Sequence, residues 1–168
     1  MSEQAPAVNP EDFKNALGSW AAGVTIVTTR GTDNQVYGLT VSSFSSLSMD
    51  PLLILVCIQN SNVLVDMVNR SGRFGVSILA LGQEDISTFF AKSGREPVAS
   101  YDQFDMEEWQ TGSPLVSGAI AQLDCELHEA IPGGDHTIFV GKVVSAAATP
   151  DKEPLIYYRR GYRKLTDI

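Results

Sequence analysis

The chain alternates short β-rich segments with turns, and this pattern limits the folds that it can adopt. Val24–Thr29 (VTIVTT) is rich in β-branched residues, and Leu52–Ile58 (LLILVCI) is a short apolar run typical of a buried strand. Turn residues separate such segments, at Gly31–Gln35 and at Asp50-Pro51. Helical patterns do not follow every strand, so a doubly wound parallel sheet fits less well than an antiparallel one. We therefore predict a mainly β fold, an antiparallel barrel that is closed or nearly closed, with a few peripheral helices.

Further strand patterns extend this prediction along the chain. Leu123–His128 alternates apolar and polar residues, which predicts a half-buried strand whose polar side chains, Asp124 among them, face water. Thr137–Val144 is its expected partner across a loop at Pro132–Asp135. The first half of the chain is expected to form an antiparallel meander, and residues 93–114 are expected to be mostly loop. The remaining expected strands are Tyr37–Phe44, Phe74–Leu79 and Leu155–Tyr158.

Three segments have helical patterns. Asn9 is the expected cap of the first helix. Phe13, Leu17 and Trp20 form an apolar stripe on it at helical spacing, and Gly23 is expected to end or follow it. The second helix is expected to be capped by Ser61. The apolar residues of the second and third helices are Val63, Leu64, Met67 and Val68, and then Ile86, Phe89 and Phe90.

Length and charge restrict the class of protein. A chain of 168 residues corresponds to one domain, which we place at residues 11–168 after a flexible segment at residues 1–10. The net charge of −8 disfavours nucleic acid and anionic membrane surfaces as partners. The first ten residues lack an apolar signal core, and the longest apolar run is too short to span a bilayer, so a cytoplasmic protein is expected.

Several common catalytic motifs are missing from the sequence. It has no G-x-G-x-x-G, no phosphate-binding G-x-x-x-x-G-K-[ST], no C-x-x-C, no H-E-x-x-H and no G-x-S-x-G. Two histidines and two isolated cysteines, Cys57 and Cys125, make a poor metal site, and no metal is expected. If the chain is an enzyme, a bound organic cofactor is expected to supply the chemistry.

Four polar segments are candidates for ligand binding. Gly38–Ser48 carries closely spaced hydroxyls that can bind a phosphate or a polyol, and Leu52–Asn62 runs from a strand into a helix N-terminus. Gly134–His136 places a histidine beside a turn, and Tyr157–Arg163 (YYRRGYR) combines aromatic rings with arginines. Each segment also has an ordinary structural interpretation, respectively a polar strand edge, a strand-to-helix connection, a hairpin turn and a basic tail.

Taken together, the order and spacing of these segments resemble a known family. The matching stretches are FKNALGSWAAGVTIVTT, GLTVSSFSSLSMDPLLILVCI, RFGVSIL, GDHTIFVGKV and PLIYYRRGYRKL, which span Phe13–Leu165. They are similar to the short-chain flavin reductases of two-component flavin-dependent monooxygenases. At DPLLI the sequence departs from many relatives, which carry a second proline there.

The resemblance implies a fold and an activity. The fold is a flavin-binding split barrel of the Greek-key type, usually assembled as a homodimer. The activity is hydride transfer from NADH or NADPH, with NADH favoured, to FMN or FAD, followed by delivery of reduced flavin to a partner monooxygenase. No side-chain acid or base is implied as catalytic, because the transfer needs only close stacking of the two rings.

The resemblance also implies which residues bind the cofactors. The residues that match flavin-binding positions are Thr40, Val41, Ser42, Ser43, Cys57, Ile58, Ser61, Phe90, Ala91 and Lys92. Those that match positions near the nicotinamide are His136, Tyr158 and Arg159. A 2′-phosphate of NADPH would favour a nearby arginine, and Arg159, Arg160 and Arg163 are the candidates.

Other functions remain open at this stage. A split-barrel protein can bind flavin without oxidising NAD(P)H, and related proteins of this broad fold include haem binders and pyridoxine-phosphate-oxidase-type enzymes. A small β-barrel interaction module without a cofactor is a further alternative, in which the arginines of the C-terminal segment would contact a protein partner.

Overall fold

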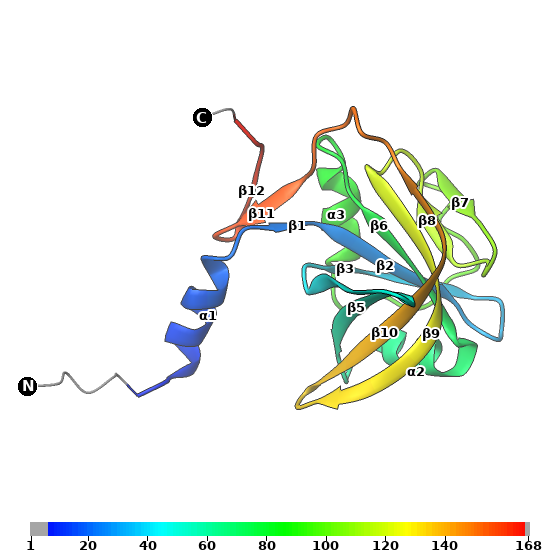
Figure 1. Ribbon diagram of the computed structural model, residues 1–168, viewed down its shortest axis with the longest axis horizontal. Coiled ribbons are helices and arrows are strands. Elements are labelled where there is room, and N and C mark those ends of the chain that lie inside the picture. Colours follow the sequence, from blue (N-terminus) through cyan, green and yellow to red (C-terminus); the bar gives the residue numbers. More distant parts are fainter. Residues whose placement is uncertain (1–6, 167–168) are drawn as a thin grey trace, which may run out of the picture.

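The structure, a computed structural model, describes residues 7–166 (Figure 1). The expected flexible segment at residues 1–10 falls mainly on residues outside this range, and a helix already begins at Pro10. The helices are α1 (Pro10–Gly18), α2 (Val63–Ser71) and α3 (Glu84–Phe90). The strands are β1 (Ala22–Gly23), β2 (Thr25–Arg30), β3 (Val36–Val41), β4 (Phe44–Met49), β5 (Leu52–Gln59), β6 (Arg73–Ile78), β7 (Met106–Glu108), β8 (Pro114–Val116), β9 (Ala121–Gly133), β10 (His136–Ala148), β11 (Ile156–Tyr158) and β12 (Gly161–Arg163).

The main sheet has seven antiparallel strands in the order β3-β2-β6-β9-β10-β5-β4. It curves into an incomplete barrel whose two edge strands are β3 and β4 (Figure 1). On the β3 edge, Val36 forms an isolated bridge with Val98. The mainly β antiparallel fold is therefore confirmed, but the barrel is not closed. A small sheet, β1-β11-β12, connects the barrel to α1.

The predicted meander in the first half of the chain is wrong. The predicted strand Tyr37–Phe44 is interrupted at Ser42 and Ser43, and its two parts become β3 and β4. These parts lie at opposite edges of the seven-stranded sheet. Local sequence does not report this order, because β6, β9 and β10 come between them from much later in the chain.

Burial on both faces explains the sequence of β2. Residues 25–29 are all buried. Val27 packs in a core with α2 and Phe139, whereas Ile26 packs in a second core with Phe90 of α3. A strand covered on both sides needs no polar alternation, and β-branched residues fill it well. By contrast, β5 alternates: Ile54, Val56 and Ile58 are buried, whereas Leu53, Leu55 and Cys57 between them are partly exposed. The expectation of a buried strand there therefore holds for one face only.

The expectation that Asp124 faces water is also wrong. Its side chain is fully buried and accepts hydrogen bonds from the Thr111 backbone N–H at 2.8 Å and from Thr111 Oγ1 at 2.5 Å. The loop at Thr111 covers this face of β9, so the carboxylate is bonded to the loop instead of to water.

The observed helix ends agree only in part with those predicted from the sequence. Asn9 caps α1 by accepting from the N–H groups of Glu11 and Asp12, as predicted. The helix ends at Gly18, and Gly23 lies instead in β1. The cap of α2 is Asn62, whose side chain accepts from the Leu64 N–H, and not Ser61. No helix within residues 7–166 is long and apolar enough to cross a membrane.

Candidate active site

A cavity of about 280 Å³ lies where β3 and α3 meet the β11–β12 hairpin. We call it the β3–α3 pocket. None of its lining side chains is charged, and its surface combines aliphatic groups, hydroxyls and two phenol rings. Such a surface suits a neutral, planar ring system with a few polar edge atoms. Its lining residues are Val24, Leu39, Thr40, Val41, Ser42, Ser87, Ala91, Tyr157 and Tyr162.

Hydrogen bonds from two elements, β3 and β12, converge on Ser87 of α3 and hold the walls of this pocket. Thr40 Oγ1 on β3 donates to the Ser87 carbonyl at 2.7 Å. The Tyr162 hydroxyl on β12 donates to Ser87 Oγ at 2.9 Å. Ser87 itself is buried within α3. The hydroxyls therefore position the pocket walls as well as lining them.

Arg95 joins the same two elements from behind the pocket. Its Nη2 donates to the Gly38 carbonyl of β3 at 2.5 Å and to the Phe90 carbonyl of α3 at 2.9 Å. Its guanidinium lies 4.9 Å from the centre of the Tyr37 ring, and 5.4 and 5.3 Å from those of Phe89 and Phe90. A cation among aromatic faces, bonded to carbonyls at a helix C-terminus, is a favourable arrangement.

Gly38 lets α3 pack closely against β3. A Cβ atom at this position would lie 2.7 Å from Cε1 of the Phe90 ring, which is too close for any side chain. Phe90 is fully buried, and its ring packs edge-on to Phe89 and Tyr101. Its side chain therefore belongs to the protein core, and only its backbone is available toward a ligand.

The structure brings four of the predicted flavin-binding residues into this pocket. Thr40, Val41, Ser42 and Ala91 all line it. Lys92 follows Ala91 directly and is exposed. Sequence reasoning missed Leu39, Ser87 and Tyr157, and it also missed Tyr162 and Arg95. Tyr162 lies in the aromatic C-terminal segment that was singled out, whereas no local signal marks Arg95.

Other predicted residues lie on a strip that continues from the pocket across β5 to β10. Ser43 Oγ donates to the Cys57 carbonyl at 2.7 Å, and the Cys57 N–H donates back to the Ser43 carbonyl at 3.3 Å. Cys57 is the register partner of Ile138, and Gln59 that of His136. Burial raises the pKa of the Cys57 thiol, which therefore stays protonated at neutral pH. Ile58 is buried and faces the core, and Ser61 is exposed beyond the end of β5.

His136 stands apart from the β3–α3 pocket. Its Nδ1 lies 2.7 Å from Asp135 Oδ1, and this hydrogen bond with the imidazole lowers the pKa of the Asp135 carboxyl. In Figure 1 the β9–β10 hairpin that carries it lies well away from β11 and β12. Tyr158 and Arg159, the other residues predicted near the nicotinamide, line a separate cavity next to α1. The predicted nicotinamide residues are therefore not gathered in one place within this chain.

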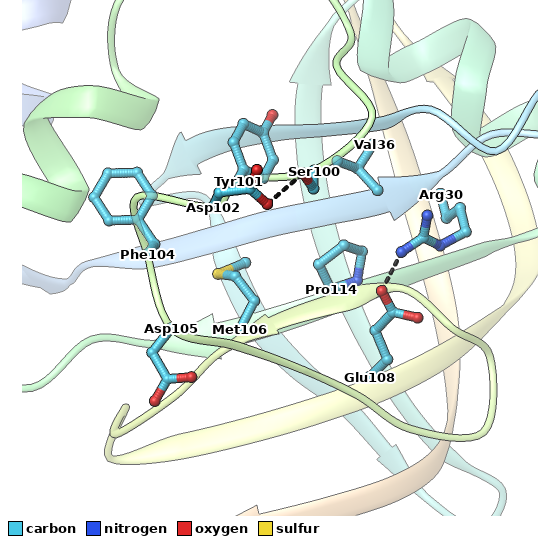
Figure 2. Close-up of a pocket in the computed structure, with 10 residues that line it drawn as sticks. All are labelled: Arg30, Val36, Ser100, Tyr101, Asp102, Phe104, Asp105, Met106, Glu108 and Pro114. Carbon is cyan, nitrogen blue, oxygen red and sulfur yellow. Dashed lines mark hydrogen bonds and ion pairs between the residues drawn. The ribbon is translucent and has the colours of Figure 1, made fainter.

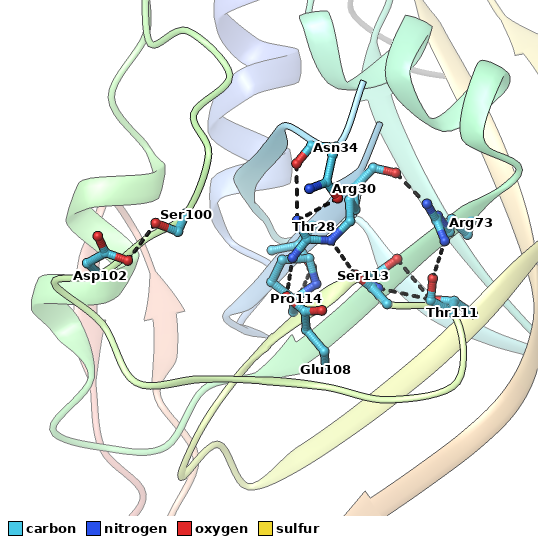
Figure 3. A network of polar contacts seen from close by, with 11 residues as sticks. Thr28, Arg30, Asn34, Arg73, Ser100, Asp102, Glu108, Thr111, Ser113 and Pro114 are labelled. Carbon is cyan, nitrogen blue, oxygen red and sulfur yellow. Dashed lines mark hydrogen bonds and ion pairs between the residues drawn. The ribbon is translucent and has the colours of Figure 1, made fainter. Parts of the chain in front are cut away.

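A further cavity, lined by residues between α3 and β8 together with Arg30 and Val36, contains none of the predicted residues. Figure 2 shows its lining, which includes the acidic side chains Asp102, Asp105 and Glu108. Glu108 forms an ion pair with Arg30. Figure 3 shows the polar network that holds the loop between β7 and β8. In it, Arg30 Nε donates to the Gly112 carbonyl at 3.1 Å.

Arg73 fixes the same loop onto β6. Its Nη1 donates to the Thr111 carbonyl at 2.5 Å, and its Nε donates to the Arg30 carbonyl at 3.3 Å. Both arginines of this network therefore have structural hydrogen bonds that account for their positions, and we assign no ligand to this cavity.

The fold and the β3–α3 pocket define a class: open antiparallel barrels with an uncharged cavity between an edge strand and a helix. Comparison with known proteins agrees and is more specific, because the family described as "Flavin reductase like domain" matches residues 17–166. The chain therefore belongs to the flavin reductase-like family.

Individual relatives are similar over nearly their whole length. An NADH-dependent FAD reductase of Streptomyces globisporus is 36% identical, with 98% of this chain and 92% of that protein covered. The reductase component of 4-hydroxyphenylacetate 3-monooxygenase from Thermus thermophilus is 39% identical, with coverage of 92% and 96%. The solved structure of the Streptomyces globisporus NADH:FAD oxidoreductase SgcE6 in complex with NAD and FAD fragments superposes with a TM-score of 0.87 at 34% identity, and covers 96% of this chain and 98% of that one.

Proposed function

We propose that this chain is an NADH-dependent flavin reductase that reduces flavin by hydride transfer and supplies it to a partner monooxygenase. The observation that carries the proposal is the uncharged, hydroxyl-lined β3–α3 pocket, which collects Thr40, Val41, Ser42 and Ala91. Membership of the flavin reductase-like family and the NADH-dependent relatives support the same function. Because the relatives include FAD reductases, we favour FAD over FMN.

The residues of the pocket fit a flavin ring system. When bound, the flavin supplies a ring that accepts hydride from a nicotinamide. Thr40 donates its hydroxyl proton to Ser87, so its Oγ1 lone pairs remain able to accept from the ring edge. Ser42 is exposed at the mouth of the pocket and can donate to a ligand. Val24, Leu39 and Val41 provide apolar contact area for a ring face.

The chain's contribution to the chemistry is positioning. Hydride transfer requires the two rings to stack at close range, and effective molarity from such positioning can account for much of the rate. The pocket lining contains no carboxylate, imidazole, amine or thiol, and its polar groups are serine, threonine and tyrosine hydroxyls. This lining is consistent with a cofactor that supplies the reactive atoms while the protein orients them.

Assembly as a homodimer is part of the proposal. No residue of α1 is buried, and its apolar side chains Phe13 and Leu17 are exposed within this chain. A second apolar area lies on the β4–β5 edge, where Met49 is 83% exposed. Exposed apolar areas of this kind are typical of subunit interfaces. A second copy of the chain would also supply a second set of nicotinamide-side residues.

The oxygenase partner is proposed from relatives. One solved relative is BorF, the flavin reductase component of a bacterial two-component tryptophan halogenase, with a TM-score of 0.85 and 34% identity, covering 95% of this chain and all of that one. Others are named as reductase components or subunits of monooxygenases. We propose that this chain likewise serves a flavin-dependent oxygenase component in the cytoplasm.

A steady-state assay in air tests the proposed activity. Purified protein is mixed with NADH and either FAD or FMN, and loss of the reduced-nicotinamide absorbance is followed. We expect fast NADH loss that requires both protein and flavin, with NADPH as the poorer donor. Flavin binding without NADH loss would instead identify a flavin-binding protein of the same fold.

A further inference from the structure

A second cavity adjoins the β3–α3 pocket and shares Ser42 and Tyr157 with it. It has a volume of about 340 Å³ and lies between the C-terminal end of α1 and the β11–β12 hairpin. We call it the α1–hairpin cavity. The Arg159 N–H donates to the Gly18 carbonyl at 3.1 Å, which joins the hairpin to the end of the helix.

The character of this cavity is cationic and aromatic. Lys14, Arg159 and Arg160 line it together with Trp20 and Tyr158. Within residues 7–166 none of these three cations forms an ion pair with a carboxylate. Three unpaired cations around one cavity are unusual in a chain whose net charge is −8. Such a cluster is expected to attract an anion.

The turn of the hairpin adds an independent observation. Arg159 and Arg160 have φ values of 46° and 60°, in the left-handed region that favours glycine or asparagine. A two-residue hairpin turn of this conformation is most readily made by Asn-Gly. This turn therefore carries two arginines at positions whose backbone conformation favours asparagine or glycine, and both arginines line the cavity. Arg159 also lies over the Tyr158 ring, at 5.3 Å from its centre.

We infer that the α1–hairpin cavity binds the phosphate-bearing adenylate half of a dinucleotide whose ring half occupies the β3–α3 pocket. Arg160 and Lys14 contact the phosphates, and Trp20 and Tyr158 offer faces for the adenine base. The inference rests on the proposed function, since it divides one dinucleotide between two adjoining cavities. Both FAD and NADH contain this adenylate half, whereas FMN lacks it.

Equilibrium binding separates these possibilities. We would measure ADP, FMN, FAD and NADH by isothermal titration calorimetry with the wild type and with a Lys14→Gln/Arg160→Gln double variant. Arg163→Gln is the matched control, because Arg163 lies on the same hairpin but does not line the cavity. We expect ADP binding to weaken about tenfold in the double variant, a moderate loss because the cavity is open to solvent. FMN binding is expected to stay within about twofold of the wild-type value.

Each outcome is decisive. If FAD binding in the double variant weakens together with ADP binding, the adenylate in this cavity belongs to the flavin. If NADH binding weakens together with ADP binding, it belongs to the nicotinamide dinucleotide. Unchanged ADP binding in the double variant, or an equal loss in Arg163→Gln, would overturn the inference. The result is separable from the proposed function, because ADP binding is measured without turnover, while absence of NADH oxidation by the wild type would reject the activity alone.

Discussion

At the scale of single residues, His136 is the position where the implied role and the observed geometry differ most. The resemblance places it near the nicotinamide, whereas the structure shows it paired with Asp135 at one end of β10, apart from Tyr158 and Arg159. A histidine in that place can orient a ligand by stacking or by donating a hydrogen bond. Its role therefore stays a prediction, and one substitution tests it directly.

Replacement of His136 by Ala is expected to raise the KM for NADH about tenfold and to leave flavin affinity unchanged, because only the nicotinamide side loses a contact. The substitution removes the hydrogen bond that lowers the Asp135 pKa, so that pKa rises toward its ordinary value. Asp135 still ionises below neutral pH, so a loss measured at pH 7 reports the imidazole. His128→Ala, at the exposed second histidine, is the control. An unchanged KM and kcat for NADH would rule out the role.

At the scale of elements, the pairing of β3 with α3 determines the pocket, and Arg95 connects them. Replacing Arg95 by Ala removes the donors to the Gly38 and Phe90 carbonyls. We expect a stability loss of about 2 kcal/mol, because buried carbonyls are left unpaired. Flavin affinity should fall as well, since Thr40 and Ala91 lose their relative placement. Urea denaturation and flavin titration measure the two effects.

A matched arginine provides the control for this element. Arg70 lies on α2 in an exposed pair with Asp66, at 3.0 Å. Arg70→Ala is expected to change stability by less than about 0.5 kcal/mol and flavin affinity not at all. Arg95→Lys keeps the charge but loses the planar guanidinium, whose Nε also donates to the Lys92 carbonyl, and its flavin affinity and stability should fall between those of wild type and Arg95→Ala. Equal flavin affinity in all three variants would show that Arg95 does not position the pocket.

Individual strands could be predicted from the local sequence, but their order in the sheet could not. Strands such as β2 and β5 are visible locally, since the β-branched and apolar runs specify them. The sheet edges are not, because whether β3 neighbours β4 is decided by strands far along the chain. The same holds for the site. The segment Gly38–Ser48 was singled out from its own hydroxyl-bearing residues, whereas Arg95 and Tyr162 matter only through tertiary contacts with Phe90 and Ser87.

At the scale of the whole molecule, the exposed stripe on α1 accounts for the proposed dimer. The helix was predicted from the spacing of Phe13, Leu17 and Trp20, but it ends at Gly18, so Trp20 lies beyond it. Phe13 and Leu17 on the helix are 56% and 58% exposed within this chain. An amphipathic helix whose apolar residues stay exposed in its own subunit is well explained by a neighbouring copy. The net charge of −8 fits moderate affinity for an anionic cofactor that must be released.

Replacement of Phe13 by Lys is expected to shift the protein from a dimer toward the 18.2 kDa chain mass, because it places a charge in the proposed interface. Light scattering coupled to size-exclusion chromatography measures the change. Asn15→Lys, about half a turn around the same exposed helix, is the control. A wild type that elutes as a monomer, or a dimer that survives Phe13→Lys unchanged, would contradict this role of α1.

Direct hydride transfer between a nicotinamide and a flavin is the central claim, and anaerobic reduction tests it most directly. Protein, NADH and FAD are mixed without oxygen, and the absorbances of NADH and of oxidised flavin are followed together. The account predicts that both decline at the same rate in equimolar amounts, and that the rate is nearly independent of pH around neutrality, because no side chain exchanges a proton in the transfer. Loss of NADH without flavin reduction, or no loss of either, would contradict it.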